Sequence, residues 1–166
     1  MRTETDILGE VQLDDSTAYG INTARAAANF PLHHRKTNLH LIYAIVTVKK
    51  AAALTYAALG VREKGIYEAI VSACDDVLAG NHDEAFVTEA LQGGAGTSTN
   101  MNVNEVLANL ALQKLGYAYG RYDIIHPLDD VNRGQSTNDV YPTALRIAAI
   151  QALRVLSDNG DTFNLV

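Results

Sequence analysis

The sequence predicts a mainly α-helical protein with a short β hairpin at its N-terminus. Apolar residues recur at helical spacing through most of the chain after residue 38. Glycines follow two of these periodic runs, Gly80 and Gly116, at positions where helices commonly end. Alternation of apolar and polar residues is confined to residues 6–15. With 166 residues, of which 48% are hydrophobic, the chain is long enough to bury the core of a globular domain.

The first part of the chain is expected to contain the hairpin and two helices. The alternation in residues 6–15 predicts a short extended segment or hairpin. Residues 16–28 favour a helix that Gly20 interrupts. Asn38 stands where an N-cap residue would begin the next helix, residues 39–59. That helix is apolar on most sides, so we expect it to be buried among other helices.

Three more helices are predicted in the rest of the chain. Residues 64–79 carry apolar side chains on one face. Residues 97–115 have one apolar side, and their other side carries a polar row formed by Asn102, Glu105, Asn109 and Gln113. The last helix is expected to begin near Asn138 or Asp139. It would place Pro142 in its first turn, where a missing N–H costs little.

The position of the last predicted helix indicates how the chain is divided into domains. Its apolar pattern continues to Leu156, where "SDNGDTFNLV" begins and Asn159-Gly160 predicts a turn. Nothing after it would cover its apolar face, so we expect either a chain that is cut short or a face that is buried against partner chains. We divide the sequence into an N-terminal domain, residues 1–135, and a truncated start of a helical bundle with an atypical tail, residues 136–166.

Composition argues against several classes of partner and location. The net charge is −6 and the Lys and Arg residues are scattered, so no basic face for nucleic acid is predicted. Lys49 and Lys50 lie in the middle of the longest apolar run, which argues against a membrane span. The single cysteine, Cys74, cannot form an internal disulfide and is expected to be a buried structural thiol. No export signal is visible, so we expect a cytoplasmic protein.

Two polar stretches share one design. "QGGAGTSTNMN" leads from a glycine-rich loop through Thr97, Ser98 and Thr99 into a helix, and "GQSTND" does the same with Ser136, Thr137 and Asn138. Free backbone N–H groups, the helix dipole and neutral donors together favour a bound anion. Two such helix starts that face each other would suit a small dicarboxylate. Simple helix capping by Ser, Thr or Asn is the alternative, but capping needs only one such residue at each start.

Other kinds of site have weaker support. Gly94-x-Gly96 lacks a third glycine and no Gly-Lys-Ser/Thr follows, so no nucleotide-phosphate loop is predicted. The histidines do not have metal-ligand spacing, so no metal site is predicted. His126, Asp129 and Asp130 could supply an acid or a base, or could simply be an exposed charged loop. Arg25 could bind a carboxylate, or could form a surface ion pair.

The two polar stretches also carry a family resemblance. "LQGGAGTSTNMNVNEVLAN", "HPLDDVNRGQSTNDVYPTALRIA", "RTETDILGEV" and "AYGINTARAAANF" resemble the N-terminal domain of the aspartase/fumarase superfamily. The form Gly93-Gly94-Ala95-Gly96-Thr97 resembles its aspartate ammonia-lyase branch, whereas class II fumarases usually have Thr-Gly-Ser-Gly-Thr. His126-Pro127 is equally typical of both branches. The resemblance covers the chain to about residue 156.

The resemblance implies a fold, a reaction and a set of site residues. It implies a helical fumarase/aspartase-like fold and deamination of L-aspartate to fumarate and ammonia, without a cofactor. Thr97 to Thr99 and Ser136 to Asn138 would bind the substrate, with Arg25 nearby. It also implies a tetramer whose sites combine segments of three chains.

The sequence departs from the family pattern in two places. The Gly-Ser-Ser-x-x-Met-Pro-x-Lys-x-Asn loop that carries the family's catalytic base does not occur in these residues, so we expect this chain alone to be inactive. Leu128 replaces the usual Asn of the His-Pro-Asn-Asp loop, which puts the secondary site of fumarases in doubt. Two alternatives therefore stay open: a class II fumarase fragment, and a non-catalytic binding or assembly module of the same fold.

Overall fold

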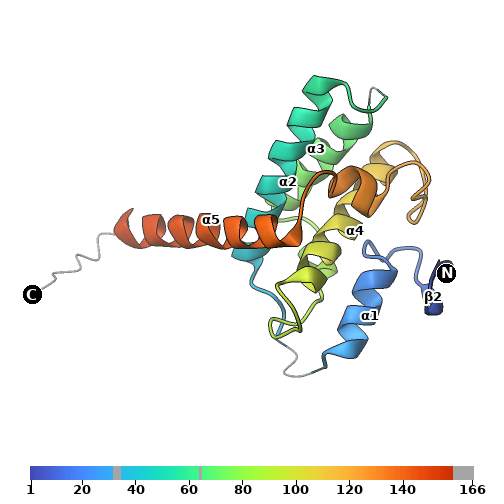
Figure 1. Ribbon diagram of the computed structural model, residues 1–166, viewed down its shortest axis with the longest axis horizontal. Coiled ribbons are helices and arrows are strands. Elements are labelled where there is room, and N and C mark those ends of the chain that lie inside the picture. The colour runs from blue at the N-terminus through green and yellow to red at the C-terminus, as the bar shows by residue number, and fades with distance from the viewer. Residues whose placement is uncertain (32–34, 64, 159–166) are drawn as a thin grey trace, which may run out of the picture.

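A computed structural model describes residues 1–31, 35–63 and 65–158 and confirms the predicted fold class (Figure 1). A two-stranded antiparallel hairpin precedes a set of helices, and its register pairs Arg2 with Leu13 and Asp6 with Gly9. The elements are β1 (Arg2–Asp6), β2 (Gly9–Leu13), α1 (Ile21–Asn29), α2 (Leu39–Leu59), α3 (Ile66–Leu78), the short 3-10 helix η1 (Asp83–Ala85), α4 (Thr97–Lys114), the π-helical turn η2 (Pro127–Val131) and α5 (Thr137–Asp158).

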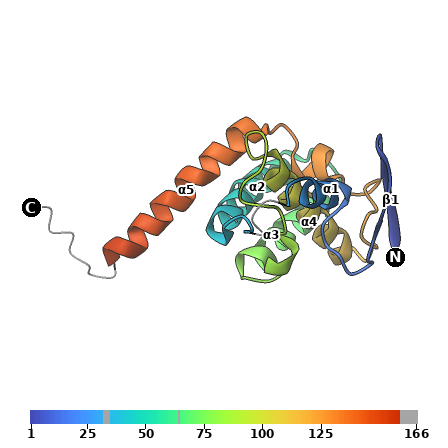
Figure 2. The same cartoon turned by 90° about the horizontal axis from the view of Figure 1, so that it is seen from below.

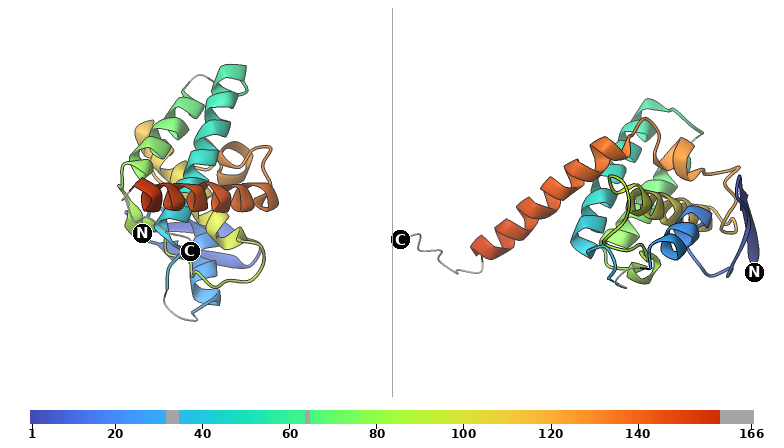
Figure 3. Two further views of the ribbon diagram at one scale, coloured as in Figure 1. Left: turned by 90° about the vertical axis from the view of Figure 1, so that its left-hand side faces the viewer. Right: turned by 60° about the horizontal axis from the view of Figure 1, so that its bottom comes forward.

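Helix α4 lies at the centre of the molecule. It contacts α1, α2, α3, α5 and η2, and between Thr99 and Leu112 all of its residues except Met101 are buried. Figure 3 shows α2 and α3 running beside it and α1 on another side. The apolar core forms where the inner faces of α2, α3 and α4 meet. Every other described segment is therefore positioned directly or indirectly by α4.

Three residues of the polar row of α4 are buried, whereas the fourth, Gln113, is exposed. Asn102, Glu105 and Asn109 are each at most 1% exposed. The amide of Asn102 accepts from the N–H of Val87 and donates to the carbonyl of Ala85. These side chains replace the backbone partners that the loops around α4 lack, so the three buried residues anchor loops instead of facing water.

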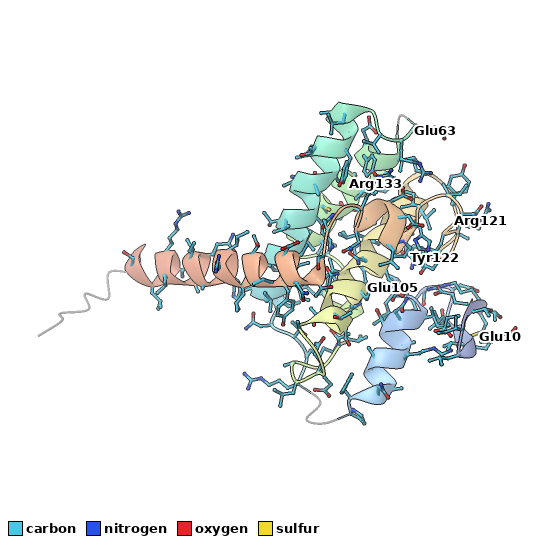
Figure 4. All side chains as sticks on the ribbon, in the orientation of Figure 1. Glu10, Glu63, Glu105, Arg121, Tyr122 and Arg133 are labelled. Carbon is cyan, nitrogen blue, oxygen red and sulfur yellow. The ribbon has the colours of Figure 1, made fainter. Side chains whose placement is uncertain are left out.

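The start of α1 shows this anchoring most clearly (Figure 4). Residues 16–19 are not helical, and Gly20 precedes the helix instead of interrupting it, which corrects the prediction of a helix over residues 16–28. The first N–H groups of a helix have no partner within it. Here Glu105 accepts from the N–H groups of Gly20, Asn22 and Thr23, and Glu4 accepts from that of Ile21.

Helices α2 and α3 follow the sequence-based predictions closely. The side chain of Asn38 accepts from the N–H of His40 and caps α2, and Gly80 has a left-handed φ of 85° just past the end of α3. Cys74 is buried as expected, and burial raises the pKa of its thiol to about 12. Of the residues that the structure describes, one helix, α2, is long and apolar enough to cross a membrane, a property that core helices of soluble proteins share.

Helix α5 leaves the body of the protein along most of its length (Figures 1 and 2). Near its start, Val140 and Ala144 are buried, whereas Leu153 is 64% exposed. The helix begins at Thr137, next to the predicted start, but Pro142 is its sixth residue and lies beyond the first turn, which corrects the predicted place of this proline. The predicted turn at Asn159-Gly160 lies outside the described residues.

Candidate functional site

The two polar helix starts meet in the structure. Gly96 has a left-handed φ of 89° and packs so closely on Tyr141 of α5 that a Cβ atom there would lie 2.3 Å from the ring. One turn further along α4, Nδ2 of Asn100 donates to Oγ1 of Thr137 over 3.1 Å. Glycine is needed here because a residue with a side chain would disfavour this backbone conformation and would clash with the Tyr141 ring. The starts of α4 and α5 are thus joined by direct contacts.

An open groove of about 370 Å³ runs between these two helix starts. Its walls come from the glycine-rich loop on one side and from the first turns of α5 on the other. None of the lining residues is charged, so positive charge reaches the groove only through helix dipoles and through groups behind its wall. The lining residues are Ala90, Gln92, Gly94, Ala95, Gly96, Asn138, Tyr141, Pro142 and Leu145.

The six polar residues predicted for this region fall into two groups. The side chains of Thr97, Ser98 and Asn138 make no hydrogen bond to any described residue, and Asn138 lines the groove. These three groups can therefore turn to a ligand.

The other three already serve the fold. Ser136 caps α5, because its Oγ accepts from the N–H of Asn138 at 3.2 Å. Thr99 is fully buried and its Oγ1 contacts Gln92 and Thr37. Thr137 is half-buried and accepts from Asn100. Ser136 thus follows the capping interpretation, whereas the hydrogen of the Thr137 hydroxyl has no acceptor among the described residues and can still be donated.

Behind the groove lies a set of hydrogen-bonded side chains that sequence reasoning missed, which we call the polar cage. Oδ1 of Asn132 accepts from Nζ of Lys49 at 3.1 Å, Nδ2 of Asn100 at 3.1 Å and Nδ2 of Asn104 at 3.3 Å. Nζ of Lys49 also donates to Oε1 of Gln135 at 3.4 Å. The polar cage consists of Lys49, Asn100, Asn104, Asn132, Gln135 and Thr137. In the sequence, Lys49 stood out as a break in an apolar run and not as part of a site.

The polar cage has two unusual electrostatic features. Lys49 is 1% exposed, and burial lowers the pKa of its ammonium group to about 7. Its hydrogen-bond partners among the described residues are neutral amide oxygens. The Oδ1 atoms of Asn100 and Asn104 are buried without a hydrogen-bond partner among the described residues. Burial of unpaired oxygens and of a cation is energetically costly, so this arrangement destabilises the fold.

Arg25 does not lie with these residues. Its Nε and Nη2 donate to the carboxylate of Asp6 at 2.7 and 2.8 Å, and Nη2 also donates to the carbonyl of Gly9. The hydrogen bonds from Arg25 hold the pKa of Asp6 below its usual range. Figure 1 shows α1 and the hairpin on the other side of the body from α5. Within this chain, Arg25 therefore acts in the ion pair that the sequence offered as its alternative.

The His126 loop also serves the fold. Nδ1 of His126 accepts from the N–H groups of Leu128 and Asp129, both at 3.2 Å, and caps the π-helical turn η2. It lies 3.4 Å from a carboxylate oxygen of Asp129, but a nitrogen that accepts two N–H groups carries no proton, so we assign a neutral ring and no ion pair. Asp130 is 2% exposed and pairs with Arg62. Among the described residues, no three His, Cys, Asp or Glu side chains are placed to hold a metal ion.

Comparison with known proteins shows which proteins have a sequence similar to that of this chain. Residues 9–164 match a family model described as Lyase. The chain is 46% identical over 155 residues to an aspartate ammonia-lyase of Helicobacter pylori, a match that covers 92% of this chain and 33% of that protein. It is 47% identical over 155 residues to a class II fumarate hydratase of Myxococcus xanthus, with the same coverage of 92% and 33%. The chain thus spans about a third of the length of these relatives.

Two solved structures named for fumarate lyase and fumarase activity have a fold similar to that of this chain. The native form of a fumarate lyase:delta crystallin from Brucella melitensis superposes with a TM-score of 0.87 at 50% sequence identity, over 90% of this chain and 35% of that one. A class II fumarase from Schistosoma mansoni superposes with a TM-score of 0.82 at 38% identity, over 89% of this chain and 31% of that one.

Proposed function

The chain belongs to the lyase family, within the aspartase/fumarase superfamily, and from this premise we propose that its groove is part of a binding site for a four-carbon dicarboxylate. The observation that carries the proposal is the meeting of the two polar helix starts: Asn138 lines the groove, Thr97 and Ser98 follow the groove-lining Gly96, and no described residue forms a hydrogen bond with these three side chains. A carboxylate needs several donors at once, and each helix start adds free N–H groups to these side chains.

We further propose L-aspartate as the substrate and its deamination to fumarate and ammonia as the reaction. The glycine-rich loop, Gly93-Gly94-Ala95-Gly96-Thr97, favours this branch over hydration of fumarate. Relatives named for both activities are similar to the chain to almost the same degree, so class II fumarase activity remains the second candidate. A non-catalytic binding module is the third.

The chemistry explains why donors are needed here. Removal of a proton from the carbon next to a carboxylate leaves negative charge that spreads onto the carboxylate oxygens. Donors that already point at those oxygens lower the barrier by about 3 to 4 kcal/mol each. Hydroxyl and amide groups suit this role because they stabilise the developing charge without a proton transfer of their own.

The groove is incomplete for catalysis on its own. None of its lining residues is cationic, and the loop that carries the family's base does not occur in these residues. We therefore propose that other segments or other copies of the chain complete the site, and that α5 from residue 136 onward begins the helical bundle through which they assemble. The apolar side chains exposed on α5, among them Ile150 and Leu153, support this assembly. A cytoplasmic location remains part of the proposal.

The test uses a complete subunit, in which this chain, through Leu156, is joined to the remaining part of the Helicobacter pylori aspartate ammonia-lyase. Fumarate formation is followed by ultraviolet absorbance with aspartate or malate as substrate. The variant Thr137→Val keeps the shape of the side chain but loses the hydroxyl, and kcat/KM should fall about 10- to 100-fold. The control Thr55→Val removes an exposed hydroxyl of α2 that bonds only to the carbonyl of Ala51 in its own helix.

Three outcomes would contradict parts of the proposal. Full activity of Thr137→Val would show that the two helix starts do not bind the substrate. Preference for malate would move the chain to the fumarase branch. Robust turnover of aspartate by the 166-residue chain alone would contradict the proposal that its site is incomplete.

A further inference from the structure

The hydrogen bonds of the polar cage form a line from Lys49 on α2 to Thr137, the residue before Asn138, which lines the groove. Lys49 donates to Asn132, Asn132 accepts from Asn100, and Asn100 donates to Thr137. Each of these contacts joins residues that are 32 or more positions apart, so the line exists only in the folded chain. We infer that Lys49 is a positioning residue: through Asn132 and Asn100 it fixes the direction in which the Thr137 hydroxyl donates. The inference rests on the proposed function of the groove.

The argument starts at the Thr137 hydroxyl. A hydroxyl has one hydrogen to donate and two lone pairs that accept. Nδ2 of Asn100 can only donate, so its contact with Oγ1 at 3.1 Å occupies a lone pair on the inner side. Its single hydrogen can then be donated to a ligand bound beside the neighbouring Asn138, which lines the groove. If Asn100 presented its oxygen instead, the hydroxyl would donate inward and would be lost to the ligand.

The orientation of Asn100 is in turn set by Asn132. The same Nδ2 group that meets Thr137 also donates to Oδ1 of Asn132 at 3.1 Å. Turning the Asn100 amide over would bring two carbonyl oxygens together, which repel each other. Asn104 repeats the arrangement one turn later, where its Nδ2 meets the same oxygen at 3.3 Å.

Lys49 determines the orientation of the Asn132 amide. An amide can present either its oxygen or its NH₂ group, whereas the ammonium form of Lys49, which prevails below its pKa of about 7, can only donate. Asn132 must therefore turn its oxygen toward Lys49, and its NH₂ group then donates to the carbonyl of Gln135 at 2.9 Å. Because Lys49 is 1% exposed, water cannot easily replace it in this role. A plain hydrogen-bonded tie between α2 and the loop before α5 would not need a buried charge.

A double-mutant cycle in the complete subunit described above tests the inference. Lys49→Met should lower kcat/KM for aspartate about tenfold, because a donor to a charged substrate loses its fixed direction. In the Thr137→Val background the same change should have almost no further effect, since no hydroxyl is left to orient. A purely structural role for Lys49 would instead give a loss that multiplies with that of Thr137→Val, and this result would overturn the inference. Full activity of Lys49→Met would also overturn it.

A second pair of variants decides the question without any change at Lys49. Asn100→Asp keeps the shape of the side chain but accepts where Asn100 donates, so the Thr137 hydroxyl should turn inward. Asn104→Asp adds the same charge on the next turn of α4, next to the same Asn132 oxygen, without contacting Thr137. We expect the loss of kcat/KM to be about tenfold greater for Asn100→Asp than for Asn104→Asp. Equal losses would overturn the inference, whereas full activity of Thr137→Val would overturn the proposed function itself.

Discussion

Replacing Glu105 with Gln should destabilise the protein far more than a change of one atom would indicate. The carboxylate is 1% exposed and accepts five hydrogen bonds at the start of α1. Oε2 accepts from the N–H of Gly20 and from the N–H and hydroxyl of Thr23, and Oε1 accepts from the N–H and amide of Asn22. A glutamine has only one acceptor oxygen, so its NH₂ group must face donors on one side.

The magnitude follows from this count of donors. The least costly orientation keeps the three bonds on the Gly20 and Thr23 side and loses the two from Asn22. Hydrogen bonds to a charged group contribute roughly 1.5 to 3 kcal/mol each. Because Asn22 is exposed, its side-chain amide can turn to water, and the loss of the buried charge offsets part of the cost. The helix dipole adds up to about 1 kcal/mol. We therefore expect a loss of about 3 kcal/mol in the free energy of unfolding.

Urea unfolding followed by circular dichroism measures this loss. A change of about 3 kcal/mol should move the midpoint by roughly 1 M or more. Hydrogen exchange should speed up first at the amide of Asn22, which loses its acceptor. The matched control is Glu10→Gln, because Glu10 is exposed on the hairpin and should tolerate the change (Figure 4). A loss of less than 1 kcal/mol for Glu105→Gln, or an equal loss for Glu10→Gln, would refute the reasoning.

Three more predictions follow from other regions. Gly96→Ala combines a left-handed φ with a clash against Tyr141, so it should lose roughly 1 to 3 kcal/mol more stability in urea than Gly116→Ala, whose Cβ would meet open space; equal losses would contradict the packing argument. The pKa of Lys49 is lowered from 10.5 to about 7, so its charge destabilises the fold fully below pH 7 and no longer above about pH 10.5. Lys49→Met should therefore raise Tm relative to the parent at pH 6 and less so at pH 10, and a difference in Tm that does not change with pH would argue against this. Leu153→Lys should reduce self-association in analytical ultracentrifugation, whereas the adjacent control Arg154→Ala should not; equal behaviour of the two would argue against assembly through this face.

The sequence predicted the helices whose boundaries depend on local signals. Asn38 caps α2 and Gly80 follows α3, and both act within a few residues of the helix end. The start of α1 could not be found in this way, because its N–H groups are accepted by Glu4 and Glu105, which lie 17 and up to 85 positions away. The burial of Asn102, Glu105 and Asn109 was not predicted for the same reason, since helical spacing shows which residues share a face but not what covers that face.

At the candidate site, too, local features could be predicted from the sequence and long-range contacts could not. The sequence singled out the two polar helix starts, and the structure brings them together at one groove. It could not show that Ser136 caps α5 while Asn138 stays free, because both are typical cap residues. Lys49 could not be identified as part of this region either, since its partners Asn132 and Gln135 lie 83 and 86 positions further along the chain.

Because α4 lies at the centre of the fold, insertions and deletions within this helix should be poorly tolerated. Successive turns of the helix hold different segments: Asn102 holds the loop at Ala85, Glu105 holds α1, and Asn109 binds the carbonyl of Ala18 and the N–H of Gly120. Adding or removing one residue inside a helix rotates everything beyond it by about 100°. One such event in α4 would misdirect several of these anchors at once, whereas the exposed turn around Gly116 could accept extra residues without disturbing any of them.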